Sequence, residues 1–251
     1  MDRNPPLLEI CVEDAEGIDA ALAGGADRIE LCSALALGGL TPFVGLVERA
    51  VASGLRVHAM VRPRAGDFVY GAEEIALMVE EIARLRALGV SGVVVGATHA
   101  DGRPDQAALG RLRDAAQQLE IVLHRAVDLA PDPVAAVGVA ADLGFDHVLS
   151  SGGKTCAPEG ATTLAAMVSE AGGRLKIIAG AGVRPDNVVA LVTTSGVDAV
   201  HASAACEQEW PDDRIRRLGF AVGPRRRTSR EIVAALAETI GSCKRRTDGD
   251  T

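Results

Sequence analysis

The sequence predicts a single-domain α/β protein, an eight-stranded β/α barrel of the TIM type that takes in residues 1–251. Three observations predict this fold. Eight short apolar runs alternate with segments of helical periodicity, which is the pattern of repeated βαβ units. Hydrophobic residues make up 48% of the chain, enough for one large core. The length of 251 residues is ordinary for such a barrel, and no linker divides the chain.

The predicted strands follow one another at fairly regular spacing. They lie at 7–12, 28–31, 56–61, 92–96, 121–124, 147–150, 176–179 and 199–201. Helical periodicity occurs between them at 14–23, 72–88, 105–118, 133–143, 159–170 and 185–194, and a helix at 231–240 closes the chain. We expect the polar stretch 207–228 to be an extended loop after the last strand, and 242–251 to be a flexible tail.

A repeated motif supports the barrel. Four times, a glycine is followed by an apolar residue, then by Asp or Ser, and then by a strand; the glycines are Gly25, Gly89, Gly144 and Gly196. A glycine at this position ends a helix in a left-handed turn, so that the strand begins at once. All four motifs precede even-numbered strands, which indicates one unit repeated around a closed sheet.

Composition and charge exclude several classes of protein. The net charge of −8 argues against a nucleic-acid partner, because a duplex-binding surface is normally basic. No run approaches the roughly 18 apolar residues of a membrane span, so we expect no membrane association. Five cysteines, an odd number without a Cys-x-x-Cys pair, indicate reduced thiols in a cytoplasmic protein and no structural zinc site.

Alternation along the strands places several polar side chains inside the barrel. Residues two apart share a face, which directs inward Glu9, Cys11, Glu30, Cys32, His58, Met60, Arg62, His124, His201 and Ser203. Strand eight closes beside strand one, so a continuous polar arc is formed by His201, Glu9, Glu30 and His58. Polar groups in a core are costly unless they serve each other or a ligand. The arc is therefore either a self-neutralised ionic network or the wall of a functional site.

The same Glu-x-Cys tripeptide ends two neighbouring strands, as residues 9–11 and 30–32. Neighbouring strands lie roughly 5 Å apart, so the inward thiols of Cys11 and Cys32 can reach one ion. Soft thiolates select Cu(I), and Met60 offers a thioether in support. The alternative is that both are buried cysteines that bind nothing, as most such cysteines do.

The loop after the third strand is rich in charge. Residues 62–70 contain two arginines, Asp67 and the single tyrosine of the chain. Arg62 lies at the barrel mouth, and a guanidinium presents a two-pronged donor to carboxylate or phosphate. We interpret the segment as an anion-holding and proton-handling loop that works through Arg62 and Asp67. An Arg–Asp pair that only braces the loop is the alternative.

The loops after strands five, seven and eight add further candidates. His124 is a candidate general acid or base, because histidine titrates near neutrality, and Asp128 is placed to orient it. Gly180, Gly182 and Ser203 form a candidate phosphate or anion site. Loops after strands seven and eight often bind phosphate in this fold, and glycines let backbone N–H groups approach an anion. A tight turn that merely requires glycine is the alternative.

Together these residues resemble the CutC copper-homeostasis family. The similar motifs lie at 8–11, 25–32, 38–42, 62–64, 66–68, 124–128, 150–152 and 179–182, within residues 7–205. The resemblance implies a β/α barrel, a cytoplasmic location and a homo-oligomer, either a dimer or a tetramer. It also implies a role in copper handling, with Cu(I) held by the cysteines that match Cys11 and Cys32. Ala65, Ser151 and Val127 depart from the family pattern, but none of these departures removes a charged group.

Two functions from different classes remain. The first is a cytoplasmic copper-homeostasis protein that binds Cu(I) through Cys11 and Cys32. The second is a TIM-barrel enzyme of the lyase, isomerase or epimerase type that acts on a small anionic or phosphorylated metabolite. Its candidate catalytic residues are Glu9, Glu30, His58, Arg62, Asp67, His124, Asp128 and His201. Loss of Cu(I) binding in a double Cys→Ser variant distinguishes the first function, and an anion bound near Gly180, Gly182 and Ser203 distinguishes the second.

Overall fold

Eight parallel strands close into a barrel in the computed structural model, which describes residues 5–242. The strands are hydrogen-bonded in sequence order, and β8 returns to β1. Their bounds are β1 Leu7–Val12, β2 Arg28–Leu31, β3 Arg56–Met60, β4 Gly92–Val95, β5 Glu120–Leu123, β6 His147–Ser150, β7 Lys176–Gly180 and β8 Ala199–Ala202. The predicted single-domain barrel is confirmed, and each strand begins and ends within one residue of its predicted limits.

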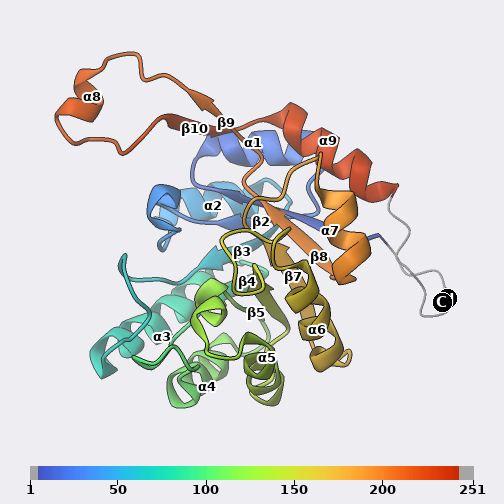
Figure 1. The fold of residues 1–251 in the computed structure, drawn as a ribbon. Helices are drawn as coiled ribbons and strands as arrows, with labels where there is room; N and C mark the ends of the chain where they lie inside the picture. Colours follow the sequence, from blue (N-terminus) through green and yellow to red (C-terminus); the bar gives the residue numbers. More distant parts are fainter. Residues whose placement is uncertain (1–4, 243–251) are drawn as a thin grey trace.

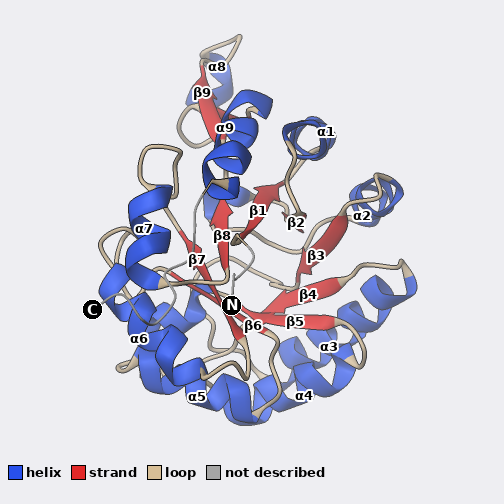
Figure 2. Ribbon diagram, turned by 90° about the vertical axis from the view of Figure 1, so that its right-hand side faces the viewer, coloured by secondary structure: helices blue, strands red, loops and turns tan. Residues whose placement is uncertain are grey.

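Helices surround the strands as an outer ring (Figure 2). They are α1 Ala15–Gly24, α2 Val44–Ala52, α3 Ala72–Ala87, α4 Gln106–Ala116, α5 Pro133–Asp142, α6 Ala161–Ala171, α7 Val188–Ser195 and α9 Arg230–Gly241. Four of them begin where a side-chain oxygen accepts a hydrogen bond from the first turn: at Asp14, Asp105, Asp132 and Ser229. The sequence pattern did not predict α2, which begins after Phe43 without such a cap. Within residues 5–242, no helix has the length and apolar character needed to span a bilayer.

The turns before the even-numbered strands follow the repeated motif. Gly25, Gly89, Gly144 and Gly196 all have positive φ, between 65° and 85°. This left-handed conformation ends the preceding helix and points the chain into the sheet. The repeat therefore sets where each even strand starts, and with it which side chains point into the barrel.

The core has two parts, one on each side of the sheet. The larger part lies between the strands and the helices. The smaller part fills the barrel interior with Cys32, Met60, Val94, Val122, Leu149, Ile178 and Ala199. This apolar filling comes from β2 to β8, and most inward polar side chains lie towards the two ends of the barrel.

The chain after β8 forms a projecting arm, residues 205–228. β9 Ala205–Gln208 pairs antiparallel with β10 Arg225–Thr228, and the short helix α8 Arg214–Arg217 lies between them. Figure 1 shows the arm reaching away from the barrel. The extended loop expected at 207–228 is thus braced at its base by two paired strands. Of the tail expected at 242–251, only residue 242 falls within the described residues.

Candidate active site at the barrel mouth

A cavity of about 940 Å³ opens at the carboxyl ends of the strands. Enzymes of this fold place their active sites at this end of the barrel. Eight of the predicted site residues line the cavity: Cys11, Glu30, Arg62, His124, Asp128, Gly182, His201 and Ser203. The volume suits a small molecule rather than a lone ion.

Five predicted site residues do not line the cavity: Asp67, Gly180 and Cys32, and the deeper Glu9 and His58. Asp67 is exposed, and its carboxylate pairs with Arg64 at 3.0 Å, which is the loop-bracing alternative. Gly180 lies beneath the mouth, where an added Cβ would be 2.6 Å from Cδ1 of Leu149. The absence of a side chain at Gly180 therefore leaves room for the Leu149 side chain inside the barrel. Cys32 is fully buried, and its Sγ donates to Oε2 of Glu30 at 3.5 Å.

Glu9 and His58 lie deeper, in a network at the amino-terminal base of the barrel that we call the base network. Nε of Arg28 donates to Oε2 of Glu9 at 2.5 Å, and Nε2 of His58 lies 2.9 Å from Oε2 of Glu120. His147 Nε2 lies 3.5 Å from the same Glu120 oxygen. Hydrogen bonds from His147 and His58 lower the pKa of Glu120 well below its ordinary value. Burial lowers the pKa of His58, so its ring favours the neutral form.

Three members of the base network are not among the predicted site residues. Arg28 and His147 each begin a strand and point inward, two residues before Glu30 and Leu149. Alternation from those neighbours is the signal that identifies them. Glu120 lies one residue before the predicted start of its strand, so a boundary error of one residue hid it.

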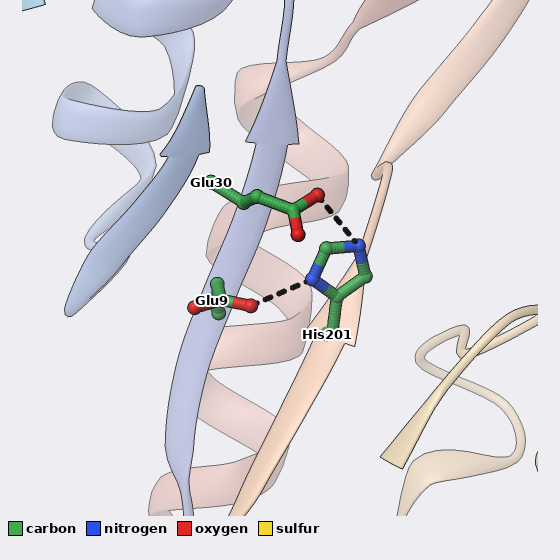
Figure 3. A group of neighbouring side chains, drawn as sticks. All are labelled: Glu9, Glu30 and His201. Atoms are coloured by element: carbon green, nitrogen blue, oxygen red, sulfur yellow. Dashed lines mark hydrogen bonds and ion pairs between the residues drawn. The ribbon is translucent and has the colours of Figure 1, made fainter. Parts of the chain in front are cut away.

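The predicted polar arc is present around His201 (Figure 3). Oε1 of Glu9 lies 2.7 Å from Nδ1 of His201, and Nε2 of the same ring lies 3.8 Å from Oε2 of Glu30. The pairing of β1 with β8 sets Glu9 opposite His201. Burial acts to lower the pKa of His201, but Cys11, Glu30 and Glu9 outweigh it and raise that pKa well above its ordinary value. His201 is therefore a buried imidazolium between two carboxyl groups.

The pKa values of the two carboxyl groups beside His201 are shifted in opposite directions. Burial alone would raise the pKa of Glu9, but Arg28 and His201 lower it well below its usual range. Burial raises the pKa of Glu30, and only part of that effect is offset by His201. Oxygens of both glutamates and a ring nitrogen of His201 lie within 4.8 Å of one another, as metal ligands do. Glu9 is already paired on both oxygens, so this set fits proton handling better than a cation.

Arg62 is a buried cation without a carboxylate partner. It is 5% exposed. Nη1 donates to the carbonyl oxygens of Leu37 and Gly39 at 2.9 and 3.1 Å, and Nη2 donates to that of Gly66 at 2.9 Å. Nε has no hydrogen-bond partner, and among residues 5–242 no carboxylate lies within 4.0 Å of the guanidinium. Buried charges in proteins are normally paired, and this guanidinium has no such partner among the described residues.

His124 directs one ring nitrogen to the backbone and leaves the other without a partner. Nδ1 accepts a hydrogen bond from the N–H of Ala126 at 3.1 Å, and Nε2 is buried without a hydrogen-bond partner. Burial, and then the charge of Arg62, lower the pKa of His124 to about 3. The ring packs against Phe68, with ring centres 4.8 Å apart. His124 is therefore neutral near pH 7.

Asp128 does not hold His124 as the sequence analysis suggested. Its carboxylate pairs with Arg125 at 2.9 Å and accepts hydrogen bonds from Oγ of Ser150 at 2.5 Å and from the N–H of Ser151 at 3.1 Å. These bonds fix the loop after β6 against the short 3-10 helix Arg125–Leu129. Asp128 lines the cavity as a loop anchor, and the backbone orients His124 instead.

The loops after β7 and β8 form the remaining wall. Ala181 and Ala204 line the cavity with φ of 76° and 44°, a region that residues with a side chain seldom adopt. Strain of this kind is concentrated at ligand-binding sites. Gly182 and Ser203 lie beside them on the same wall, where Arg184 and Arg226 add positive charge. The predicted anion site at these loops remains a prediction.

Known proteins are similar to this chain over most of its length. A model of the CutC family matches residues 6–206. The family protein CutC of Agrobacterium fabrum is 46% identical over 243 residues, which cover 96% of this chain and 97% of the relative. That of Sinorhizobium medicae is 44% identical over 233 residues, with coverages of 93% and 95%. A crystal structure of CutC from Streptococcus agalactiae superposes with a TM-score of 0.75 at 31% identity, over 79% of this chain and 98% of that one.

Proposed function

The chain belongs to the CutC family, and on that premise we propose that it is an enzyme acting on a small anionic or phosphorylated metabolite. The chemistry is acid–base, of the lyase, isomerase or epimerase type. The observation that carries the proposal is Arg62, a buried cation that lines the mouth cavity and has no carboxylate partner among the described residues. An anionic ligand is the group that satisfies such a cation.

The charge around the opening supports an anionic ligand. Arg184 and Arg226 line the same cavity as Arg62, as does Arg125, which pairs with Asp128, although the chain carries a net charge of −8. Cations gathered in a concave site raise the local concentration of anions there. A ligand of opposite charge is therefore favoured in a protein that repels anions elsewhere.

The acid–base groups lie in the same cavity. Glu30 lines it, and its Oε1 is buried without a hydrogen-bond partner. Burial raises the pKa of Glu30, which brings this carboxyl group closer to the pH at which it can both accept and return a proton. The charged ring of His201, whose Nε2 lies 3.8 Å from Oε2 of Glu30, stabilises the carboxylate form of Glu30 and so opposes the rise of its pKa.

Ligand screening tests the proposed function. Thermal unfolding is followed in inorganic phosphate, small sugar phosphates and small carboxylates, for the wild type, Arg62→Met and Arg64→Met. Arg64 is the matched control, because it lies two residues away and pairs with Asp67 outside the cavity. We expect at least one anion to raise Tm in the wild type and in Arg64→Met but not in Arg62→Met. An equal response of all three proteins, or none from any, contradicts the proposal.

A second candidate function is the binding of Cu(I) as cargo at Cys11 and Cys32. The name of the Streptococcus agalactiae relative, which refers to copper homeostasis, favours it. Both cysteines are free and buried, and Cys11 lines the cavity. Cys32 fits less well, because burial and the neighbouring Glu30 raise the pKa of its thiol well above the ordinary value. Binding of Cu(I) must therefore displace a proton from Cys32.

Anaerobic titration with Cu(I) against a competing chelator tests this candidate. The proteins are the wild type, the double variant Cys11→Ser/Cys32→Ser, and the control Cys156→Ser/Cys206→Ser, which changes the two other described cysteines. Tight one-to-one binding in the wild type and control, lost in the first variant, supports copper handling. Binding that the first variant retains excludes these ligands.

We also propose a cytoplasmic homo-oligomer, a dimer or tetramer. On the projecting arm, Leu218, Phe220 and Val222 are 67%, 79% and 80% exposed, and apolar groups of this size in one patch favour a protein contact. The four described cysteines are free thiols, as in a reducing compartment. Light scattering on the wild type and on L218S/F220S/V222S tests the assembly. A monomeric wild type contradicts it, and dissociation of the variant assigns the contact to the arm.

A further inference from the structure

The free ring nitrogen of His124 is a hydrogen-bond donor, not a lone pair. Its Nδ1 accepts a hydrogen bond from the N–H of Ala126 at 3.1 Å, so that nitrogen carries no proton. A neutral imidazole has one N–H, which must then be at Nε2. Nε2 is buried and has no hydrogen-bond partner. The residue lines the mouth cavity, so its unused donor lies in a side chain of the site.

The packing around His124 keeps this tautomer and sets Arg62 beside it. The Phe68 ring lies 4.8 Å from the His124 ring, and Cζ of Arg62 lies 4.9 Å from the centre of the same Phe68 ring. A Cβ at Gly96, directly after β4, would overlap the imidazole, so the absence of a side chain there leaves room for the ring. His124 and Arg62 therefore both contact the Phe68 ring, and each has one buried donor without a hydrogen-bond partner, Nε2 and Nε.

We propose that Nε2–H of His124 and Nε–H of Arg62 form an oxyanion site, and that the substrate is a small anionic carbonyl compound. The inference rests on the proposed function and names its substrate class. Fixed donors stabilise an oxygen more strongly as it gains negative charge, and that difference is what accelerates a reaction. His124 then acts as a neutral electrophilic catalyst, in contrast to the general acid or base that its position in the sequence suggested.

Glu30 supplies the proton acceptor for this reaction. It lines the same cavity, and its Oε1 is buried without a partner. The carboxylate takes a proton from the carbon next to the carbonyl group. The electron pair of that C–H bond forms a C=C bond, and the carbonyl oxygen takes the displaced pair as an enolate held by His124 and Arg62. Return of the proton to the opposite face of the same carbon completes an epimerisation. Where that carbon carries a hydroxyl group, the hydroxyl proton passes to the enolate oxygen and the carbon-bound proton returns to the former carbonyl carbon, which completes an isomerisation. Neither route needs an oxidant.

Nitrogen NMR of the histidine-labelled protein tests the state of His124 without a substrate. The His124 resonances are assigned by comparison with His124→Gln, and oxalate serves as a stable anionic mimic of an enolate. We expect the Nε2–H form from pH 8 to pH 5, and a shift of that N–H signal on addition of oxalate. His99, which lines a different pocket, is the internal control and should not respond to oxalate. A proton on Nδ1, or titration of His124 near pH 6.5, overturns the inference.

Exchange in D₂O tests the chemistry. Pyruvate, oxaloacetate and dihydroxyacetone phosphate are incubated with the wild type, Glu30→Gln, His124→Gln and the arm control Glu209→Gln. We expect deuterium to enter next to the carbonyl group of at least one probe, with the rate lowered at least 100-fold in the first two variants and unchanged in the control. Retained oxalate binding by Glu30→Gln shows that this variant is folded.

The outcomes separate the two proposals. If the probes bind at Arg62 and none exchanges, the inference is overturned and the anion site of the proposed function stands. If exchange persists in Glu30→Gln or in His124→Gln, the assignment of these residues is wrong. If neither the three probes nor oxalate bind, the inference falls with the proposed function.

Discussion

The base and the mouth of the barrel hold the same kinds of side chain and use them in different ways. At the base, Arg28 meets Glu9 at 2.5 Å, and His58 meets Glu120 at 2.9 Å. At the mouth, Arg62 donates to three carbonyl oxygens and has no carboxylate partner in the described part of the chain. Residue type therefore does not separate a structural network from a site. The presence of a counter-ion within the protein does separate them, because a charge that is already paired does not require a ligand.

The first test of this contrast removes a carboxylate from the base network. In Glu9→Gln, Arg28 and His201 lose the carboxylate that they share. Because the uncompensated charges stay buried, we expect the free energy of unfolding to fall by about 3–5 kcal/mol. Urea denaturation measures it, and Glu209→Gln on the arm is the exposed control, with a change of about 0.5 kcal/mol or less. A loss in Glu9→Gln as small as that of the control would contradict a stabilising role for the base network.

The second test uses pH and the neutral state of His124. Its pKa is about 3 in the folded protein, against 6.5 in a model peptide. Between these values the unfolded chain binds a proton that the folded protein rejects, so stability contributed above pH 6.5 is lost as the pH falls towards 3. The loss attributable to this residue approaches about 1.4 kcal/mol per pH unit. Denaturation of His124→Gln from pH 7 to pH 4 should show a shallower decline than the wild type, and parallel curves contradict the buried neutral ring.

The third test replaces Arg62 at the barrel mouth. Replacing Arg62 with Met removes the guanidinium that pairs with the anion. We expect the affinity for the anion found by screening to fall about 10–100-fold, as it does when a charged hydrogen bond is lost. Arg62→Lys keeps the charge but cannot reproduce the planar set of donors, so its affinity for the anion should lie between those of the wild type and Arg62→Met. Calorimetric titration measures the affinities. If Arg62→Met unfolds as readily as Glu9→Gln while keeping its affinity, the mouth and the base do not differ as described.

The fourth test displaces His124 without removing it. A Cβ at Gly96 would overlap the imidazole, so Gly96→Ala should cost about 1–3 kcal/mol of stability and weaken oxalate binding. Gly241→Ala is the control, because an added Cβ at that position meets no atom within 4 Å. Urea denaturation and NMR titration report the two effects. An unshifted His124 resonance in Gly96→Ala shows that the ring is not held as the structure places it.

The smallest effect is expected at Asp67. Its pair with Arg64 at 3.0 Å is exposed to solvent, and such pairs contribute less than about 1 kcal/mol. Asp67→Asn should therefore change neither stability beyond that amount nor anion affinity. A large loss of affinity in the same calorimetric titration returns Asp67 to the candidate catalytic residues.

The fold and most of the site were predictable because they depend on local patterns. Period-two alternation placed Glu30, Arg62, His124 and His201 at the mouth, and strand order then brought Glu9 beside His201. Partners supplied by distant loops were not predictable. Asp128 follows His124 by four residues, yet the loop after β6 claims its carboxylate through Ser150. Whether a charge is paired is a property of the folded chain, and that property separates Arg28 from Arg62.

The most direct test observes both arginines in one experiment. The Nε–H signals of Arg28 and Arg62 are assigned by NMR in the deuterated protein and followed during titration with oxalate and with inorganic phosphate. We expect the Arg62 signal to shift in a saturable manner, because its Nε has no partner, and the Arg28 signal to stay in place, because its Nε donates to Glu9. A stationary Arg62 signal, or equal shifts at both arginines, would contradict the assignment of the mouth as an anion-binding site.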